Sequence, residues 1–264
     1  MNTATYAVRD SATMLRRNLK HMARYPSQTL MLIGLPLLFL LLFVYVFGGT
    51  MGAGLPGAQA GDRGDYLTFI TPAILVMAVA SVSISTAVSV ASDMTGGIID
   101  RFRTIAIARV SVLTGHVLGA MVQTTLALTT VFGVAFLVGL ETAASATQWL
   151  GLVGLLALLS FAMTWLTVAL GLASPNPEAA SNWPMIFILL PFVGSGFVPV
   201  ESMPAGLRWF AEYQPFTPIM DVFRGLLAGS PDGSDVLRAI GWCVAIGLVG
   251  YLWSRRLYRT RAAN

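Results

Sequence analysis

The sequence predicts an all-α integral membrane protein, built as a single domain over residues 1–264 with six transmembrane helices. Its residues are 56% hydrophobic and only 11% charged, and the mean hydropathy is +0.74, whereas average soluble domains carry roughly 25% charged residues. The apolar residues also gather in long uncharged runs, which favour a lipid environment. These observations exclude an ordinary soluble enzyme. Two further elements are predicted: an N-terminal interfacial amphipathic helix, and an outer re-entrant helical hairpin between spans 5 and 6.

The cytoplasmic segment 1–29 has the pattern of an amphipathic helix. Its apolar positions, three or four residues apart on one face, are Val8, Ala12, Leu15, Leu19 and Met22. Its flank and opposite side carry Arg9, Arg16, Arg17, Lys20 and Arg24. We expect this helix to lie along the membrane surface until Pro26 ends it and turns the chain into the bilayer. Anionic lipid, a partner protein or both could hold its basic side.

Six runs reach the roughly 18 apolar residues expected of a transmembrane helix, at residues 30–47, 67–92, 112–140, 149–173, 183–200 and 236–254. We expect no cleavable signal peptide, because the polar stretch before the first run is too long and too charged for one. With the connections taken alternately as inside and outside, twelve basic residues fall on one side and four on the other. The positive-inside rule then places both termini in the cytoplasm.

The cytoplasmic loop 93–111 contains a glycine pair followed by a cluster of charges. Gly96 and Gly97 break the helix of the second span, and a short amphipathic helix can restart at Ile98. One face of that helix is apolar, formed by Ile98, Phe102 and Ile105. Its other positions carry Asp100, Arg101 and Arg103. The plainer alternative is a polar hairpin that only supplies positive-inside charge.

Residues 201–235 connect the fifth and sixth runs, and their prolines precede apolar helical patterns. Pro204 opens a first helix that Pro215 stops, with apolar residues at Leu207, Trp209, Phe210 and Tyr213. Thr217 and Pro218 are typical of the N-cap and first residue of a second helix, which ends at Gly229. Because such helices need cover from water, the hairpin either dips into the outer leaflet or packs on the outer ends of the spans. The fifth run contains Pro191 and Gly194-Ser195-Gly196, which fits a span that breaks into this hairpin.

The predicted spans contain almost no ionisable groups, apart from His116 near the start of the third and Arg238 at the edge of the sixth. Ion-coupled carriers keep such groups at membrane depth, so that class is disfavoured, and we expect His116 to be interfacial rather than a proton relay. We expect no catalytic site, no metal site and no phosphate-binding loop, since Lys20 is the only lysine and Cys243 the only cysteine. The pI near 9.6 reflects positive-inside loops and not a nucleic-acid partner.

Small residues in the second and third runs indicate helix-packing surfaces. They are Ser81, Ser85, Ser89, Gly115 and Gly119. We expect these positions to pack against other helices of the same chain, and the alternative is a contact surface between two copies in a dimer.

Taken together, these segments resemble the membrane subunit of an ABC-2 type exporter, most closely the daunorubicin-resistance permease branch, over nearly the whole chain. The most specific matches are the loop residues 95–104 (TGGIIDRFRT) and the hairpin residues 203–208 (MPAGLR), 214–217 (QPFT) and 224–227 (RGLL). One departure follows the loop motif, where the family usually has a Leu-Pro pair and this chain has Ile105-Ala106.

The resemblance implies a six-span ABC-2 half-transporter that exports a lipophilic drug or a lipid-like amphiphile across a bacterial plasma membrane. It would pair with a second permease subunit, as a homo- or heterodimer, and with separate ATP-binding subunits that hold ATP and Mg²⁺. This chain would itself hold no cofactor and catalyse no reaction. The residues that the ATP-binding subunits would grip are Ile98, Asp100, Arg101, Phe102, Arg103, Ile105, Arg16, Arg17 and Lys20. The resemblance assigns four further residues to the outer hairpin, namely Pro204, Trp209, Pro215 and Arg224.

Two other functions compete with this interpretation. An ABC-2 permease for a polysaccharide or a lipid-linked glycan would be expected to line its route with aromatic and polar side chains, and the predicted spans contain few polar ones. A membrane scaffold that transports nothing would leave the glycine-broken loop and the apolar hairpin unexplained. An exporter without carboxylates at membrane depth and without a nucleotide-binding loop needs an outside energy source, which ATP hydrolysis by a partner provides.

Overall fold

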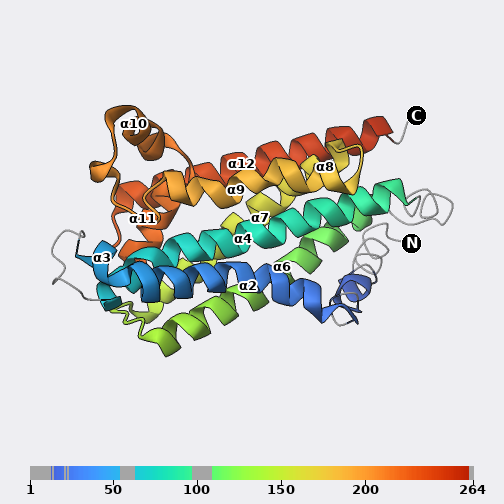
Figure 1. Ribbon diagram of the computed structural model, residues 1–264. Helices are drawn as coiled ribbons and strands as arrows, with labels where there is room; N and C mark the ends of the chain where they lie inside the picture. Colours follow the sequence, from blue (N-terminus) through green and yellow to red (C-terminus); the bar gives the residue numbers. More distant parts are fainter. Residues whose placement is uncertain are drawn as a thin grey trace.

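The computed structural model describes residues 13, 15–20, 22, 24–53, 63–96 and 109–261. Every regular element within these ranges is helical, which confirms the all-α class for the described part of the chain. Figure 1 shows the long helices running side by side along one common direction.

Five helices are long and apolar enough to cross a bilayer. The first is Pro26–Gly52, in which α2 (Pro26–Leu42) continues through a π-helical turn (Phe43–Phe47) into α3 (Gly48–Gly52). The other four are α4 (Arg63–Thr95), α6 (Arg109–Val138), α7 (Ala146–Ala173) and α12 (Gly233–Arg261). They correspond to five of the six predicted runs, and the chain is a multi-pass membrane protein.

Helix α4 lies at the centre of the bundle. In its most apolar stretch 83% of the residues are buried, against 22% in the first span and 17% in α12. Helix α7 packs closely against α4 at Gly171, where the absence of a side chain permits the contact. A Cβ at this position would come within 2.5 Å of the Ala87 carbonyl oxygen. The outer helices instead expose large apolar side chains such as Met31, Leu137 and Leu248, which lipid tails can cover.

The fifth predicted run, 183–200, is not one long helix. It follows α8 (Pro177–Asn182) and is divided among a 3-10 turn (Trp183–Met185), α9 (Ile186–Leu189), a second 3-10 turn (Leu190–Val193) and an irregular stretch. Pro184 and Pro191 fall in the two 3-10 turns, because a proline inside a helix removes a backbone hydrogen bond and clashes with the carbonyl four residues earlier. The break at Pro191 was predicted and the one at Pro184 was not, and the count of six spans is not confirmed.

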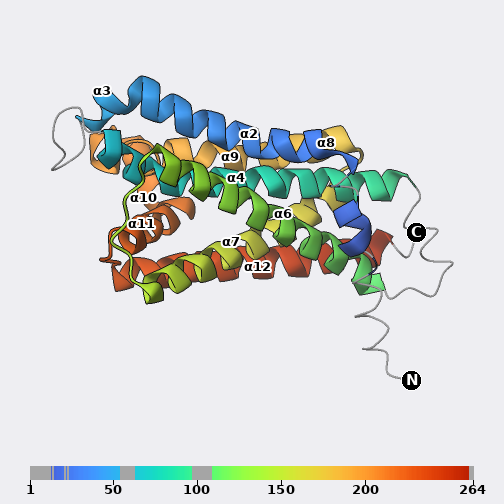
Figure 2. The same cartoon turned by 90° about the horizontal axis from the view of Figure 1, so that it is seen from below.

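The bundle has two chemically distinct ends (Figures 1 and 2). At one end lie the helical segment 15–20, the end of α4, the start of α6 and the end of α12, with Arg255, Arg256 and Arg259. We call this the basic end. At the opposite end lie α3, α10 and α11, and we call it the hairpin end. The described parts of the two termini therefore share one end of the bundle.

At the hairpin end the chain forms α10 (Ala205–Tyr213) and α11 (Phe216–Leu227). As predicted, α10 begins after Pro204 and ends before Pro215. Nine residues of α11 are buried, and this helix packs on α4, α7 and α12, between which it is visible in Figure 2. Of the two arrangements expected for the hairpin, the structure shows packing on the ends of the spanning helices, and a re-entrant course is not confirmed.

Candidate functional site at the two ends of the bundle

The predicted partner-coupling residues fall into two groups. Arg16, Arg17 and Lys20 lie on the described helical segment 15–20. The second group lies outside the described residues, and comprises Ile98, Asp100, Arg101, Phe102, Arg103 and Ile105. The start of their loop is described: α4 ends at Thr95, and Gly96 donates its N–H to the Ser92 carbonyl oxygen at 2.9 Å. The second span therefore ends where the glycine pair predicted.

A buried acid at the end of α4 holds Arg17. The Arg17 guanidinium donates a hydrogen bond to Oδ2 of Asp93, and Nε2 of His116, near the start of α6, lies 3.0 Å from the same oxygen. Asp93 and His116 are only 8% and 7% exposed. A buried carboxylate costs free energy unless it is paired and hydrogen-bonded, so Asp93 requires partners of this kind.

Asn18 makes a second contact between the same elements. Its Nδ2 donates to the Gly115 carbonyl oxygen at 3.0 Å, and a Cβ at Gly119 would come within 2.8 Å of that nitrogen. The segment 15–20 can lie this close to α6 because position 119 has no side chain. We call Arg17, Asn18, Asp93, Gly115 and His116 the basic-end latch.

The latch joins three elements that are far apart in the sequence: the N-terminal segment, the end of α4 and the start of α6. Asp93 is the first residue of the predicted coupling loop 93–111, and it lies two residues before the end of α4 at Thr95. A displacement of the end of α4 must therefore either carry the segment 15–20 with it or break the bonds of Arg17 and His116 to Asp93.

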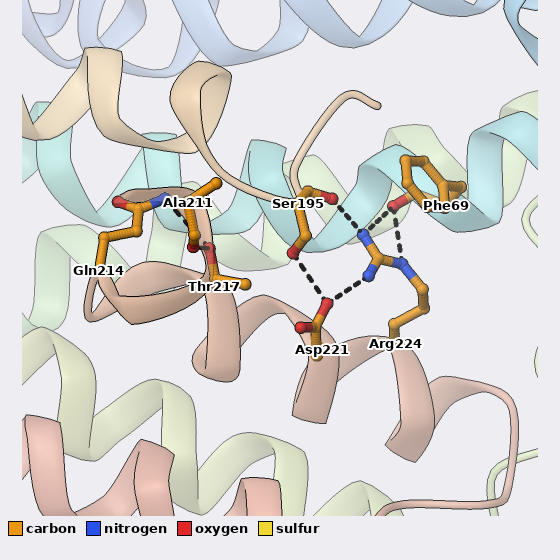
Figure 3. A network of polar contacts seen from close by, with 7 residues as sticks. All are labelled: Phe69, Ser195, Ala211, Gln214, Thr217, Asp221 and Arg224. Atoms are coloured by element: carbon orange, nitrogen blue, oxygen red, sulfur yellow. Dashed lines mark hydrogen bonds and ion pairs between the residues drawn. The ribbon is translucent and has the colours of Figure 1, made fainter. Parts of the chain in front are cut away.

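At the hairpin end, Arg224 of α11 joins α4 and the turn that follows Val193 (Figure 3). Its Nε and Nη2 donate to the Phe69 carbonyl oxygen at 3.3 and 3.2 Å, and Nη2 donates to the Ser195 carbonyl oxygen at 2.8 Å. Its Nη1 donates to Oδ1 of Asp221 at 2.6 Å, and the Ser195 hydroxyl donates to that oxygen at 2.8 Å. The guanidinium carbon lies 4.0 Å from the centroid of the Phe69 ring, a cation–π contact.

Burial and pairing act in opposite directions on this ion pair. Burial raises the pKa of Asp221, against the lowering effect of Arg224 and the Ser195 hydroxyl. Burial also lowers the pKa of Arg224, against the raising effect of Asp221. The side chains of Arg224 and Asp221 are 22% and 32% exposed, so the protein replaces most of their hydration with fixed partners. Arg224 thereby fixes the hairpin to α4.

Gln214 and Thr217 hold the turn between α10 and α11. The Gln214 Nε2 donates to the Leu190 carbonyl oxygen and to the Thr217 hydroxyl oxygen, both at 3.1 Å. The Thr217 hydroxyl donates to the Ala211 carbonyl oxygen, as Figure 3 shows. The prediction that Thr217 caps the second helix is wrong, because α11 begins earlier, at Phe216. Thr217 instead bonds back to α10.

The other end of α11 is held by the connection between α6 and α7. The Thr142 hydroxyl and the Ala143 N–H donate to the Leu227 carbonyl oxygen at 2.8 and 3.0 Å, and the Gln148 Nε2 donates to the Gly229 carbonyl oxygen at 2.7 Å. Gly229 has a φ of +80°, a conformation that favours glycine, and it follows the end of the helix as predicted. Helix α11 is thus held at both ends.

Helix α10 has an apolar face that the described part of the chain leaves uncovered. Its exposed residues are Leu207, Trp209, Phe210 and Tyr213, and the rings of Trp209 and Tyr213 pack with their centroids 5.6 Å apart. Aromatic side chains with a polar group are enriched where membrane meets water. This face therefore suits the interfacial layer of a bilayer.

A family model described as ABC-2 type transporter matches residues 10–228, which include both ends of the bundle. The chain belongs to the ABC-2 type transporter family. It is 30% identical over 261 residues to the daunorubicin resistance ABC transporter permease protein DrrB1 of Streptomyces coeruleorubidus, covering 98% of this chain and 89% of that protein. It is 22% identical over 248 residues to the probable doxorubicin resistance ABC transporter permease protein DrrC of Mycobacterium tuberculosis, covering 94% and 87%. The predicted resemblance is confirmed.

Membership of the ABC-2 family makes this chain a membrane transport subunit and not a catalytic one. The sequence predicted the basic-end latch of this permease only in part. Asp93 was assigned to the loop, whereas it lies buried in the last turn of α4, and His116 is buried and paired at the basic end. A signal was present: Asp93 is the first acid after Asp65, and His116 begins the next, antiparallel span. A lone acid and a lone histidine placed in this way predict a pair across a helical hairpin.

Proposed function

We propose that this chain is the membrane-spanning subunit of an ATP-driven exporter that moves a lipophilic drug or a lipid-like amphiphile out of a bacterial cell. A separate ATP-binding subunit, with its ATP and Mg²⁺, supplies the energy, and a second permease subunit completes the transporter. Membership of the ABC-2 family carries this proposal. The relatives named for daunorubicin and doxorubicin resistance support a lipophilic cargo.

Six crossings are part of this proposal. From α8 through the second 3-10 turn, Pro177–Val193, the chain has seventeen helical residues in succession. At about 1.5 Å per α-helical residue and 2.0 Å per 3-10 residue, this segment is about 29 Å long, close to the roughly 30 Å of a hydrocarbon core. It runs alongside the spanning helices (Figure 1). The shared end of the termini fits an even number of crossings, with the basic end in the cytoplasm and the hairpin in the outer leaflet of the plasma membrane.

The ATP-binding subunit would bind the basic end. Arg16 and Lys20 are exposed on the segment 15–20, on which the latch residues Arg17 and Asn18 also lie. The predicted apolar face of the loop, centred on Phe102, would enter a groove of that subunit, since a helix this short is not stable alone in water. The latch supports this arrangement because it ties both contact regions to the end of α4.

Co-purification tests the proposed function. The tagged chain, extracted in mild detergent from its native membrane, should bring an ATPase with it, and the activity of the complex should rise with a hydrophobic drug. Arg16→Glu combined with Lys20→Glu should weaken the complex, whereas the matched change Arg238→Glu at the hairpin end should not. Nucleotide hydrolysis by the isolated chain, or recovery of the intact chain without any ATPase, would contradict the proposal.

A further inference from the structure

A polar cavity lies beside the latch, beneath the segment 15–20 and between α2, α4 and α6. Its volume is about 70 Å³, and nine of its twelve lining residues carry polar side chains. Such a concentration of polar groups is unusual in a bundle whose spanning helices are otherwise apolar. The cavity reaches from Asn18 on the N-terminal segment to Ser85 on α4 and Gln123 on α6.

Several of these polar groups have no hydrogen-bond partner within the described part of the chain. They are the side chains of Gln28, Ser85, Ser89 and Gln123. Several hydroxyls elsewhere in the spans donate to the carbonyl four residues earlier, as Thr71, Ser81 and Thr125 do, although the buried hydroxyls of Ser83 and Thr124 have no partner in the described part of the chain. The predicted packing stripe is therefore divided, because Ser81 is buried whereas Ser85 and Ser89 line the cavity. Gln28 and Ser89 are exposed and Ser85 and Gln123 are half-buried, so their polar groups are accessible to an occupant from outside the chain that can hydrogen-bond with them.

The lining limits the charge of that occupant. Among the described residues that line the cavity, none is Asp, Glu, Lys or Arg. His116 lines it, but its Nε2 is hydrogen-bonded to Asp93, which also accepts from Arg17. A phosphate would need cationic donors and an ammonium group would need an acid. Amide, hydroxyl and imidazole groups instead suit an uncharged head group that both donates and accepts hydrogen bonds.

We propose that this cavity binds the uncharged, hydrogen-bonding head group of an amphiphile from the membrane leaflet at the basic end. A cavity of 150 Å³ holds one benzene molecule, so the volume of this one matches a small hydroxylated or amide head. The tail would lie outside, along the exposed apolar side chains Leu30 of α2 and Leu118 and Val122 of α6. Binding of the head group does not depend on the proposed export function. Only the fate of the amphiphile does, since it is either cargo entering the transporter or a lipid that stays bound.

Photo-crosslinking of the full chain in phosphatidylcholine nanodiscs tests the cavity. The two probes are a diacylglycerol and the phosphatidic acid with the same acyl chains, each with a diazirine next to the glycerol. We expect the diacylglycerol to label peptides covering residues 18–29, 85–89 or 116–123 at least threefold more than the phosphatidic acid. Gln123→Leu and Ser85→Ala should each lower this labelling about three- to tenfold, as the loss of one hydrogen bond predicts. Ser92→Ala, exposed on the same helix and outside the lining, should leave it unchanged.

Equal labelling by both probes, or wild-type labelling in both Gln123→Leu and Ser85→Ala, would overturn the inference. This assay uses the chain alone, so its outcome does not depend on an ATP-binding partner. A second arm, with the assembled transporter, measures ATPase stimulation by dioctanoylglycerol. If Gln123→Leu loses both labelling and stimulation, the head group belongs to cargo. If labelling is lost and stimulation persists, it belongs to a resident lipid, and either result supports the cavity.

Discussion

The side chain of Arg224 attaches the hairpin to α4 and to the turn at Ser195. Its guanidinium donates at once to carbonyl oxygens from α4 and from the turn at Ser195, and to the carboxylate of Asp221. A planar fork with several fixed donors can make these bonds together, whereas the ammonium group of lysine is a single point on a flexible stem. Charge alone therefore cannot replace the arginine.

Loss of Arg224 should destabilise the protein. Arg224→Leu leaves Asp221 partly buried without its cation. We expect the free energy of unfolding to fall by about 2–3 kcal/mol, just below the roughly 3–5 kcal/mol of fully buried pairs, because both side chains keep some exposure. Arg224→Lys should lose less. Thermal unfolding of the detergent-purified chain measures both changes.

The matched control is Arg238→Leu, because the Arg238 side chain is 68% exposed and reaches Asp235 only at 3.3 Å. It should change stability little. Adding Asp221→Leu to Arg224→Leu should restore part of the lost stability, since no unpaired charge then remains. If Arg224→Leu were as mild as Arg238→Leu, the hairpin would not depend on this residue.

The sequence points to Arg224 only through its family resemblance, and it gives no indication of the partners. The Phe69 carbonyl lies 155 positions away in the chain, and a backbone acceptor leaves no mark on the residue type. For the same reason, the sequence did not predict that Asn18 donates a hydrogen bond to the Gly115 carbonyl oxygen. Side-chain pairs such as Asp93 and His116 are easier to foresee, because their rarity in apolar spans marks both members.

At the scale of elements, two glycines of the hairpin end make a direct comparison. A Cβ at Gly194 would lie 1.9 Å from Nε2 of Gln214, whereas a Cβ at Gly206 in α10 would meet nothing within 4 Å. We expect Gly194→Ala to destabilise the hairpin by about 1–3 kcal/mol through overpacking, and Gly206→Ala to be neutral or slightly stabilising. Limited proteolysis at residues 201–235 measures the difference, and equal protection of the two variants would contradict the packing of this turn.

The latch can be tested by a reversible cross-link. The Cβ atom of Asn18 lies 3.0 Å from a Cβ built at Gly119, close enough for a disulfide after a small shift. In a Cys243→Ala background, Asn18→Cys with Gly119→Cys should link under oxidation, as peptide mass spectrometry detects. The link should lower drug-stimulated ATPase activity of the assembled transporter, and reduction should restore it.

The matched control for the cross-link is Lys20→Cys with Gly119→Cys, since Lys20 is exposed on the same segment. This pair should link more slowly. Faster linkage of the control than of the Asn18 pair would place a different face of the segment against α6 and contradict the latch.

Several helix boundaries could be predicted from prolines and glycines, because these residues end or begin a helix through local backbone geometry. Pro204 and Pro215 bound α10, and α4 ends at the Gly96-Gly97 pair. Helix α11 was harder to place, because its amphipathic pattern predicts only that one face needs cover. Whether lipid or protein provides that cover depends on contacts with α4, α7 and α12, which local patterns do not encode.

At the scale of the whole molecule, composition alone predicted the membrane class, because long apolar runs have few alternatives. Composition did not predict which faces of the helices contact lipid and which contact another subunit, since both environments accept the same apolar side chains. The polar cavity beside the latch was missed for a related reason. Ser85, Ser89 and Gln123 come from two helices, and only their packing brings them into one wall.

Orientation is tested by labelling of single cysteines in intact cells, in a Cys243→Ala background. Ser230→Cys, at the hairpin end, should react with an impermeant thiol reagent, because that end is expected outside. Thr13→Cys, at the basic end, should react only after the cells are opened. Labelling of Thr13→Cys in intact cells would reverse the orientation.

The central claim is that a separate ATP-binding subunit drives export through the basic end, and ATP-dependent drug uptake into inside-out proteoliposomes tests it most directly. Wild-type chain should take up drug only with the ATP-binding subunit present. Phe102→Ala should abolish most uptake, since truncating a buried aromatic anchor costs about 2 kcal/mol or more, and Arg103→Ala should act more mildly, since rim charges are worth about 0.2–1 kcal/mol. Uptake by the chain alone, or wild-type uptake in Phe102→Ala, would contradict the account.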